Sequence, residues 1–137
     1  MENITLQIET TIHPTESEQK VKKAVENIFG PIPMQTKQAH EMYMLTSEAN
    51  GQDALFKLRN TLANDHIRDA ARKALFHGLR GSTIIFYLNK QVAFAGHISF
   101  SEESAESPLG PITVTIKSSS PQQLIDWVAP GTQKHRT

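Results

Sequence analysis

The sequence has no cysteine among its 137 residues. This absence excludes disulfides, thiolate metal sites and cysteine nucleophiles, and it is typical of proteins from a reducing compartment. No apolar run approaches the ~20 residues that a transmembrane helix needs. Neither charge is in excess, because 14 Lys and Arg balance 14 Asp and Glu. We therefore expect a cytoplasmic protein with no membrane partner, in which any attraction for a polyanion is local.

Motifs for catalysis are missing as well. None of the six histidines has a second histidine four residues away, and no carboxylate cluster joins them into a zinc site. The serines lack a nucleophile elbow, and no glycine-rich loop with its lysine could hold a phosphate. A hydrolase built from Asp65, His66 and Asp69 is the weakest alternative, because arginines three residues further on keep both aspartates ionised. The sequence predicts a protein that is not an enzyme and that holds no metal or cofactor.

The periodicity of apolar residues predicts strands and helices that follow one another in a mixed order. Alternation in steps of two indicates half-buried strands, and spacing of three or four indicates helices. A capping box of Thr15 and Glu18 starts the first helix, and Asn64 or Asp65 caps the third. We expect strands over 4–12, 38–47 and 112–118, two strands joined near Asn89–Lys90 within 82–100, and helices within 13–31, 52–64, 65–78 and 120–128.

These elements together predict an α+β fold. Strands that follow each other through short turns, each with one apolar face, call for a mostly antiparallel sheet with helices packed on one face. We expect about five strands in one domain spanning residues 1–130. Residues 101–111 form a loop, and residues 131–137 form a disordered tail.

Positive charge is concentrated between Asp53 and Lys90, where seven bases face three acids. The helix within "DHIRDAARKALFHGLRG" places its alanines and Leu75 on one side and its charged residues on the other. One interpretation is a solvated face whose Asp65 and Asp69 pair with nearby bases on the same helix. The other is a face that binds a polyanion, since two carboxylates cannot neutralise four bases. The sequence leaves both open.

The segment "GLRG" at residues 78–81 has the spacing of the loop by which KH domains clamp RNA. In KH domains that loop joins two helices, whereas residue 82 here begins a predicted strand. We therefore interpret "GLRG" as the end of a helix followed by a turn.

Four segments, "HIRDAARKAL", "LNKQVAFAG", "SPLGPI" and "LIDWVAP", occur in an order that resembles a family of small archaeal proteins described as RNA-binding and otherwise uncharacterised. The resemblance spans nearly the whole chain. It implies a fold similar to the large-subunit ribosomal protein that holds the small ribosomal RNA in the central protuberance, and RNA as a partner. It transfers no catalytic residue. The residues inside the matching segments are His66, Arg68, Asp69, Arg72, Lys73, Asn89, Lys90, Gln91 and the loop 107–111.

Our leading hypothesis is a non-enzymatic protein that binds the backbone of structured RNA through its basic helix. The alternative is a protein-interaction subunit without nucleic-acid binding, such as a homodimer formed through a sheet edge or through residues 42–45. The predicted RNA-binding residues are Arg59, His66, Arg68, Arg72, Lys73, Arg80, Asn89, Lys90 and Gln91.

Overall fold

Seven strands form one antiparallel sheet in the computed structural model, which describes residues 3–102 and 109–131. The strand order is β2-β3-β1-β7-β5-β4, and β6 pairs with β5. The strands are β1 (Thr5–Ile12), β2 (Met34–Ala39), β3 (Met42–Asn50), β4 (Leu79–Arg80), β5 (Thr83–Asn89), β6 (Phe100–Ser101) and β7 (Pro111–Lys117). The helices are α1 (Glu18–Phe29), the 3₁₀ helix η1 (Gln52–Leu55), α2 (Phe56–Asn64), α3 (Arg68–His77), α4 (Lys90–Phe94) and α5 (Pro121–Val128).

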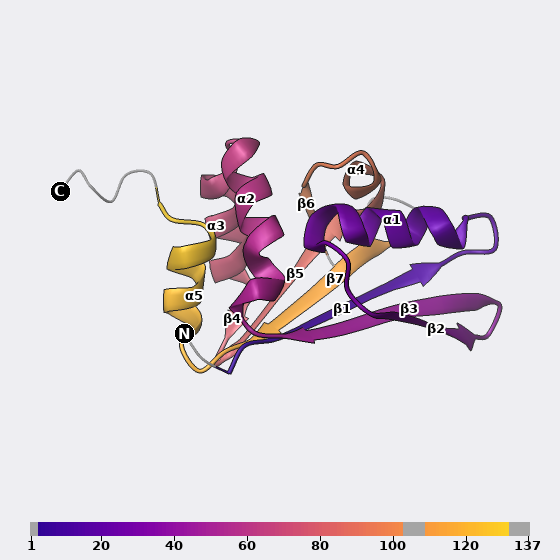
Figure 1. Cartoon of the computed structure of the whole chain (residues 1–137), viewed down its shortest axis with the longest axis horizontal. Coiled ribbons are helices and arrows are strands. Elements are labelled where there is room, and N and C mark those ends of the chain that lie inside the picture. Colours follow the sequence, from indigo (N-terminus) through magenta and orange to yellow (C-terminus); the bar gives the residue numbers. More distant parts are fainter. Residues whose placement is uncertain (1–2, 103–108, 132–137) are drawn as a thin grey trace.

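The helices cover one face of the sheet, as the strand alternation predicts. Along β1, Leu6 and Ile8 are buried whereas Gln7 and Glu9 are exposed. Figure 1 shows α1 and α4 over one end of the sheet and α2, α3 and α5 grouped at the other end. The core therefore lies between the sheet and this helical layer. The α+β class and the single helical layer are confirmed.

The prediction of about five strands is wrong, because the region of one predicted strand forms a hairpin and because Leu79–Arg80 forms the unpredicted strand β4. Residues 38–47 were expected to form one strand, but β2 and β3 pair in register from Met34↔Ser47 to Ala39↔Met42. The chain reverses at His40, whose φ is 60°. Residues 42–45 lie in β3, which is paired on both sides, so this segment is no free edge for a homodimer. The outer edge on this side of the sheet is β2.

The predicted hairpin over 82–100 is also wrong in its second half. The chain leaves β5 at Asn89 and turns into α4, and only Phe100 and Ser101 return to pair with β5. The Asn89 side chain accepts a hydrogen bond from Val92 N at 2.9 Å, which caps the helix. At the other end, Asn27 Nδ2 of α1 donates to the carbonyls of Ala93 and Phe94 at 3.0 and 2.9 Å. Caps at both ends hold this five-residue helix.

Two predicted helix starts are displaced. Ser17, rather than Thr15, caps α1 by accepting from Lys20 N, although Gly30 ends the helix as expected. Neither Asn64 nor Asp65 caps α3, which begins at Arg68 after Ile67 without a side-chain cap. His66, in the preceding turn, has a φ of 59°, a conformation uncommon for residues other than glycine.

Part of the predicted loop over 101–111 and most of the predicted tail lie outside the described residues, including Ser107 and Pro108. Gly110, with φ at 84°, leads into β7. Over residues 3–102 and 109–131, no helix is long and apolar enough to cross a membrane. The same residues contain no group of three or more His, Asp or Glu side chains suited to a metal ion.

Candidate nucleic-acid interface

A groove of about 630 Å³ runs between α3 and the edge of the sheet at β5 and β6. One side of α3 forms the first wall, with small residues at its base and basic residues beside them. The second wall comes from β5, β6 and the residue that follows β6. The lining residues are Ala70, Lys73, Ala74, His77, Gly78, Arg80, Ile85, Phe86, Tyr87, Phe100, Ser101 and Glu102.

Ala70 and Ala74, which the helical pattern places on the same side as Leu75, line this groove. On α3 only Ala71 and Leu75 are buried. Ala70 is exposed and Ala74 is half-buried, one turn further along the helix. Because alanine side chains are short, this face of α3 leaves open space beside the sheet that longer side chains would fill.

Gly78 holds the two walls at a fixed separation. Its carbonyl accepts a hydrogen bond from Ile85 N at 3.1 Å. A Cβ atom at this position would lie 1.8 Å from the carbonyl oxygen of Ile85, which is far inside van der Waals contact. Only glycine permits this approach of the end of α3 to β5. The "GLRG" segment is therefore the end of a helix and a turn, as interpreted from the sequence, and Gly81 occupies the turn with φ at 64°.

Three basic side chains line the groove on the α3 side. Lys73 and His77 are one helical turn apart, and Arg80 follows on β4. All three are exposed. Arg80 Nη1 donates to the carbonyls of His77 and Leu79 at 3.0 and 2.8 Å, and the guanidinium keeps further N–H donors for a ligand. Among the described residues, no carboxylate forms a salt bridge with Lys73, His77 or Arg80.

The sheet side of the groove is aromatic with one acid. The rings of Phe86 and Phe100 pack together with centroids 5.9 Å apart. Tyr87 also lines the groove, but it follows Phe86 on β5, so its side chain points to the opposite face of the sheet. Glu102, directly after β6, is exposed. A groove with basic residues on one wall and aromatic surface on the other offers both a phosphate contact and an apolar contact to one ligand.

Arg59 and Arg72 belong to a different surface, on the side of the helical layer that meets α5. Arg59 Nε donates to the carbonyl of Trp127 at 2.9 Å, and its guanidinium lies 5.1 Å from the centroid of the Trp127 ring. Arg72 Nη1 forms a salt bridge with Asp126 at 2.7 Å and contacts the carbonyl of Ala129 at 3.3 Å. These two arginines fasten α5 to α2 and α3.

The pairing predicted within the basic helix does not hold for two of its residues. Asp65 forms a salt bridge with Nδ1 of His97, at 3.1 Å, rather than with Arg68. Arg72 pairs with Asp126, which lies on another helix. Asp65 and Arg72 thus form their salt bridges with residues outside this segment. Lys73, His77 and Arg80 form none with a described carboxylate.

Lys90 is buried, with 4% of its surface exposed, so the prediction that it contacts RNA is wrong. Its Nζ donates to the carbonyls of Thr11 and Leu109 at 2.8 and 2.9 Å and forms a salt bridge with Glu16 at 3.1 Å. Glu16 also accepts from His13 N at 2.9 Å. Burial lowers the pKa of Lys90, and the hydrogen bond and charge of Glu16 oppose that shift.

The other predicted site residues are not in the groove. Asn89 caps α4, so its amide oxygen is engaged within the protein and is not free for a base. Gln91 lies on α4 beside a pocket of about 340 Å³ between α1 and α4. His66 and Arg68 lie at the junction of α2 and α3. Of the nine predicted residues, the groove brings together only Lys73 and Arg80.

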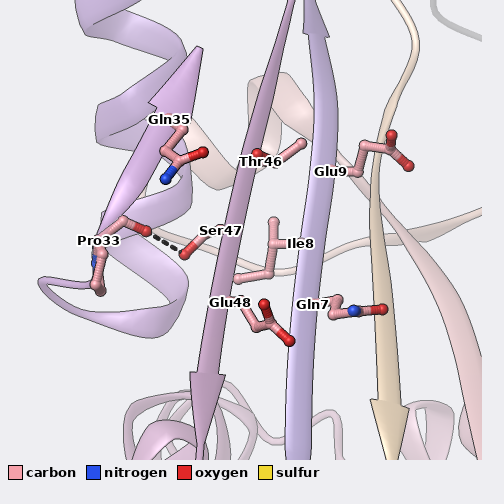
Figure 2. Close-up of a pocket in the computed structure, with 8 residues that line it drawn as sticks. All are labelled: Gln7, Ile8, Glu9, Pro33, Gln35, Thr46, Ser47 and Glu48. Carbon is pink, nitrogen blue, oxygen red and sulfur yellow. Dashed lines mark hydrogen bonds between the residues drawn. The ribbon is translucent and has the colours of Figure 1, made fainter. Parts of the chain in front are cut away.

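A second hollow, of about 370 Å³, lies near the outer edge of the sheet at β1, β2 and β3. Figure 2 shows Gln7, Thr46 and Gln35 around it, with the carboxylates of Glu9 and Glu48 set apart from each other, and with the hydrogen bond from Ser47 to the carbonyl of Pro33. Its two acids and the absence of a basic residue from its lining make it unsuited to phosphate.

Sequence reasoning missed His77, Tyr87, Phe100 and Glu102 as site residues. The spacing of Lys73 and His77, four apart on a helix, is a signal that could have placed His77 beside Lys73. Phe100 and Glu102 could not be found in this way, because only the pairing of β6 with β5 brings them to α3, and Tyr87 reaches the groove through the contact of β5 with the end of α3.

A protein-family model described as RNA binding matches residues 5–118. A "UPF0201 protein" from Pyrobaculum arsenaticum is 40% identical over 96% of this chain and 92% of that relative. The chain belongs to the UPF0201 family. Another member, from Sulfurisphaera tokodaii, is 42% identical over 93% of this chain and 88% of its own length.

Solved structures agree with this assignment. The crystal structure of a UPF0201 protein from Methanococcus jannaschii superimposes with a TM-score of 0.83 at 30% identity, covering 95% of this chain and 96% of that chain. A DUF54 protein from Methanothermobacter thermautotrophicus, at 15% identity and a TM-score of 0.64, covers 91% of this chain and 95% of its own, and shares the fold. The UPF0201 family described as RNA binding is thus the archaeal family that the sequence resembles.

Proposed function

We propose that this UPF0201 protein is a non-enzymatic RNA-binding protein whose contact surface is the groove between α3 and the β5–β6 edge. Lys73, His77 and Arg80 hold phosphates of a structured RNA. The observation that carries this proposal is that three exposed basic side chains line one wall of a single groove without a salt-bridge partner among the described residues.

The electrostatics of the chain support a local site of this kind. The protein has no net charge, so attraction for RNA depends on where cations gather. Arg72 forms a salt bridge with Asp126, and Lys90 is buried against Glu16, so these two contribute less to a surface field than their positions in the sequence suggest. Lys73 and Arg80 form no salt bridge with a described carboxylate, and the contacts of Arg80 with two carbonyls leave its charge in place.

The proposal differs in its residues from the basic helix face expected from sequence. It keeps Lys73 and Arg80, adds His77, and leaves Arg68 and His66 as flanking positions at the start of α3. The similarity to the ribosomal protein of the central protuberance stays a prediction, and so does a cytoplasmic location.

The test is a titration of the protein against a structured RNA hairpin at several salt concentrations. Lys73→Gln combined with Arg80→Gln removes two charges from the groove. If both contact phosphates, the slope of log affinity against log salt falls by roughly 1.8, and affinity falls roughly 60-fold at ~0.1 M salt. Lys23→Gln combined with Lys37→Gln is the matched control, because it removes the same charge from exposed sites on α1 and β2.

Equal losses in the two double variants would mean that only net charge matters and would overturn the groove assignment. Wild-type protein that binds no RNA at low salt would overturn the function itself. Light scattering on the same samples tests a homodimer, and an assembly that occludes the groove would favour a protein-interaction role instead.

A further inference from the structure

We infer that the groove reads an unpaired guanine of the RNA, with Glu102 as the residue that recognises the base. This inference rests on the proposed function and goes beyond it, since phosphate contacts alone carry no sequence preference. It starts from a feature that phosphate binding does not explain, namely an exposed carboxylate in the lining of a groove that otherwise favours anions.

The dimensions of the groove suit a base that has left its helix. Its volume of about 630 Å³ lies in the range of sites that enclose a small molecule. Ala70 and Ala74 leave room along one wall, and Phe100, whose ring packs against Phe86, supplies aromatic surface along the other. An unstacked base can lie against such surface, which is how proteins commonly hold single-stranded or bulged nucleotides.

The position of Glu102 favours guanine over the other bases. A carboxylate only accepts hydrogen bonds, and its two oxygens can accept two parallel N–H groups. On its Watson–Crick edge, guanine presents two adjacent donors, N1–H and the 2-amino group. Adenine and cytosine present one donor beside an acceptor nitrogen, which repels a carboxylate, and uracil presents one donor between two carbonyls.

The two walls of the groove contact different parts of the RNA. Lys73, His77 and Arg80 contact the phosphates on either side of the unpaired nucleotide, and Glu102 contacts the base. Among the described residues Glu102 has no salt-bridge partner, so its oxygens are available to a base.

The experiment measures fluorescence anisotropy with four RNA hairpins that share one stem. One is fully paired, and the others carry a single bulged guanosine, inosine or adenosine. Because each hydrogen bond to a charged group is worth roughly tenfold or more, we expect wild-type protein to bind the guanosine bulge at least about tenfold more tightly than the adenosine bulge. Inosine lacks the 2-amino group and falls between them.

The variant Glu102→Gln separates base recognition from simple charge. Losing the carboxylate weakens binding to the guanosine bulge, and it strengthens binding to the fully paired stem because a repulsive charge has gone. Glu41→Gln, at the β2–β3 turn on the opposite edge of the sheet, removes the same charge elsewhere and should preserve the preference for guanosine.

Each other outcome overturns the inference in a recognisable way. Equal affinity for all bulges, or a uniform gain for every RNA in Glu102→Gln, removes guanine recognition and leaves RNA binding in place. Failure of every hairpin to bind removes the proposed function as well. Displacement of the RNA by an equal concentration of guanosine monophosphate would identify a site for free nucleotides and overturn the assignment to RNA.

Discussion

Lys73 and Lys90 are the same residue type, and both were expected from sequence to hold RNA, yet the fold gives them opposite environments. Lys73 is exposed in the groove beside His77 and Arg80, whereas Lys90 is buried against Glu16 and two carbonyls. Among the residues that the structure describes, the first has no salt-bridge partner, whereas the second is paired with a carboxylate of its own chain. The number of basic residues in a sequence segment is therefore a poor measure of the electrostatic potential at the surface, because some of those residues are buried and paired with acids.

Replacing the buried lysine should have the largest effect on stability. Lys90→Met leaves the carboxylate of Glu16 buried without its cation, and breaking a buried pair in this way costs about 3–5 kcal/mol of unfolding free energy. Denaturant titration measures the loss. Lys73→Met is the matched control and should change stability by less than about 0.5 kcal/mol while weakening RNA binding. The comparison fails if Lys90→Met keeps its stability and loses RNA affinity as Lys73→Met does.

The separation of the groove walls should be the next most sensitive feature. Gly78→Ala forces α3 away from the carbonyl of Ile85, and we expect a loss of about 1–3 kcal/mol together with weaker RNA binding. Gly131→Ala provides the control, since a Cβ there would lie 3.5 Å from Arg72, an ordinary contact. Unchanged stability in Gly78→Ala would show that the groove tolerates a wider separation than the structure has.

Arg72 tests the other side of α3. Arg72→Gln removes the contact with Asp126 and the stacking on Phe76, whose ring centroid lies 5.0 Å from the guanidinium carbon. These partly exposed interactions are worth roughly 0.5–1.5 kcal/mol together, so the melting temperature should fall slightly. RNA affinity should stay near that of the wild type. A loss of affinity equal to that of Lys73→Gln would extend the RNA surface to α5.

The smallest expected effect is a dependence of stability on pH. Burial lowers the pKa of Lys90 below the value of 10.5 that it has when the chain is unfolded. Below 10.5 the unfolded chain therefore binds more protons at this residue than the folded protein, and stability rises with pH over that window. The contribution is lost as pH falls from 10.5 through the folded pKa. The contribution of Lys90 is the difference between the unfolding free energies of the wild type and of Lys90→Met, measured at a series of pH values. If this difference does not rise as pH approaches 10.5, the pKa of Lys90 is not lowered by folding.

The parts of the fold that sequence predicts well are those governed by local pattern. β1 and β7 alternate because one face of each strand meets the helices and the other meets solvent. The same rule failed at residues 91–100, where Val92 and Phe94 continue an alternating pattern inside a helix and turn. Periodicity cannot distinguish these cases over so few residues.

The candidate site was predicted only in part, for a related reason. Lys73 and Arg80 were found because they lie in a basic segment. The engagement of Lys90 by Glu16 joins residues 74 positions apart, and no local pattern reveals it. Glu102 and Phe100 reach the groove only through the two-residue pairing of β6 with β5.

The amide of Asn27 makes the conformation of α4 conditional on another part of the chain. Five residues are too few to stay helical in water by themselves. A peptide containing only residues 82–101 would lack the two hydrogen bonds that α1 donates to the carbonyls of Ala93 and Phe94. Without those bonds the fragment can form the extended structure that its alternating pattern favours. The pattern therefore describes the preference of the isolated segment, whereas the helix depends on contacts with α1.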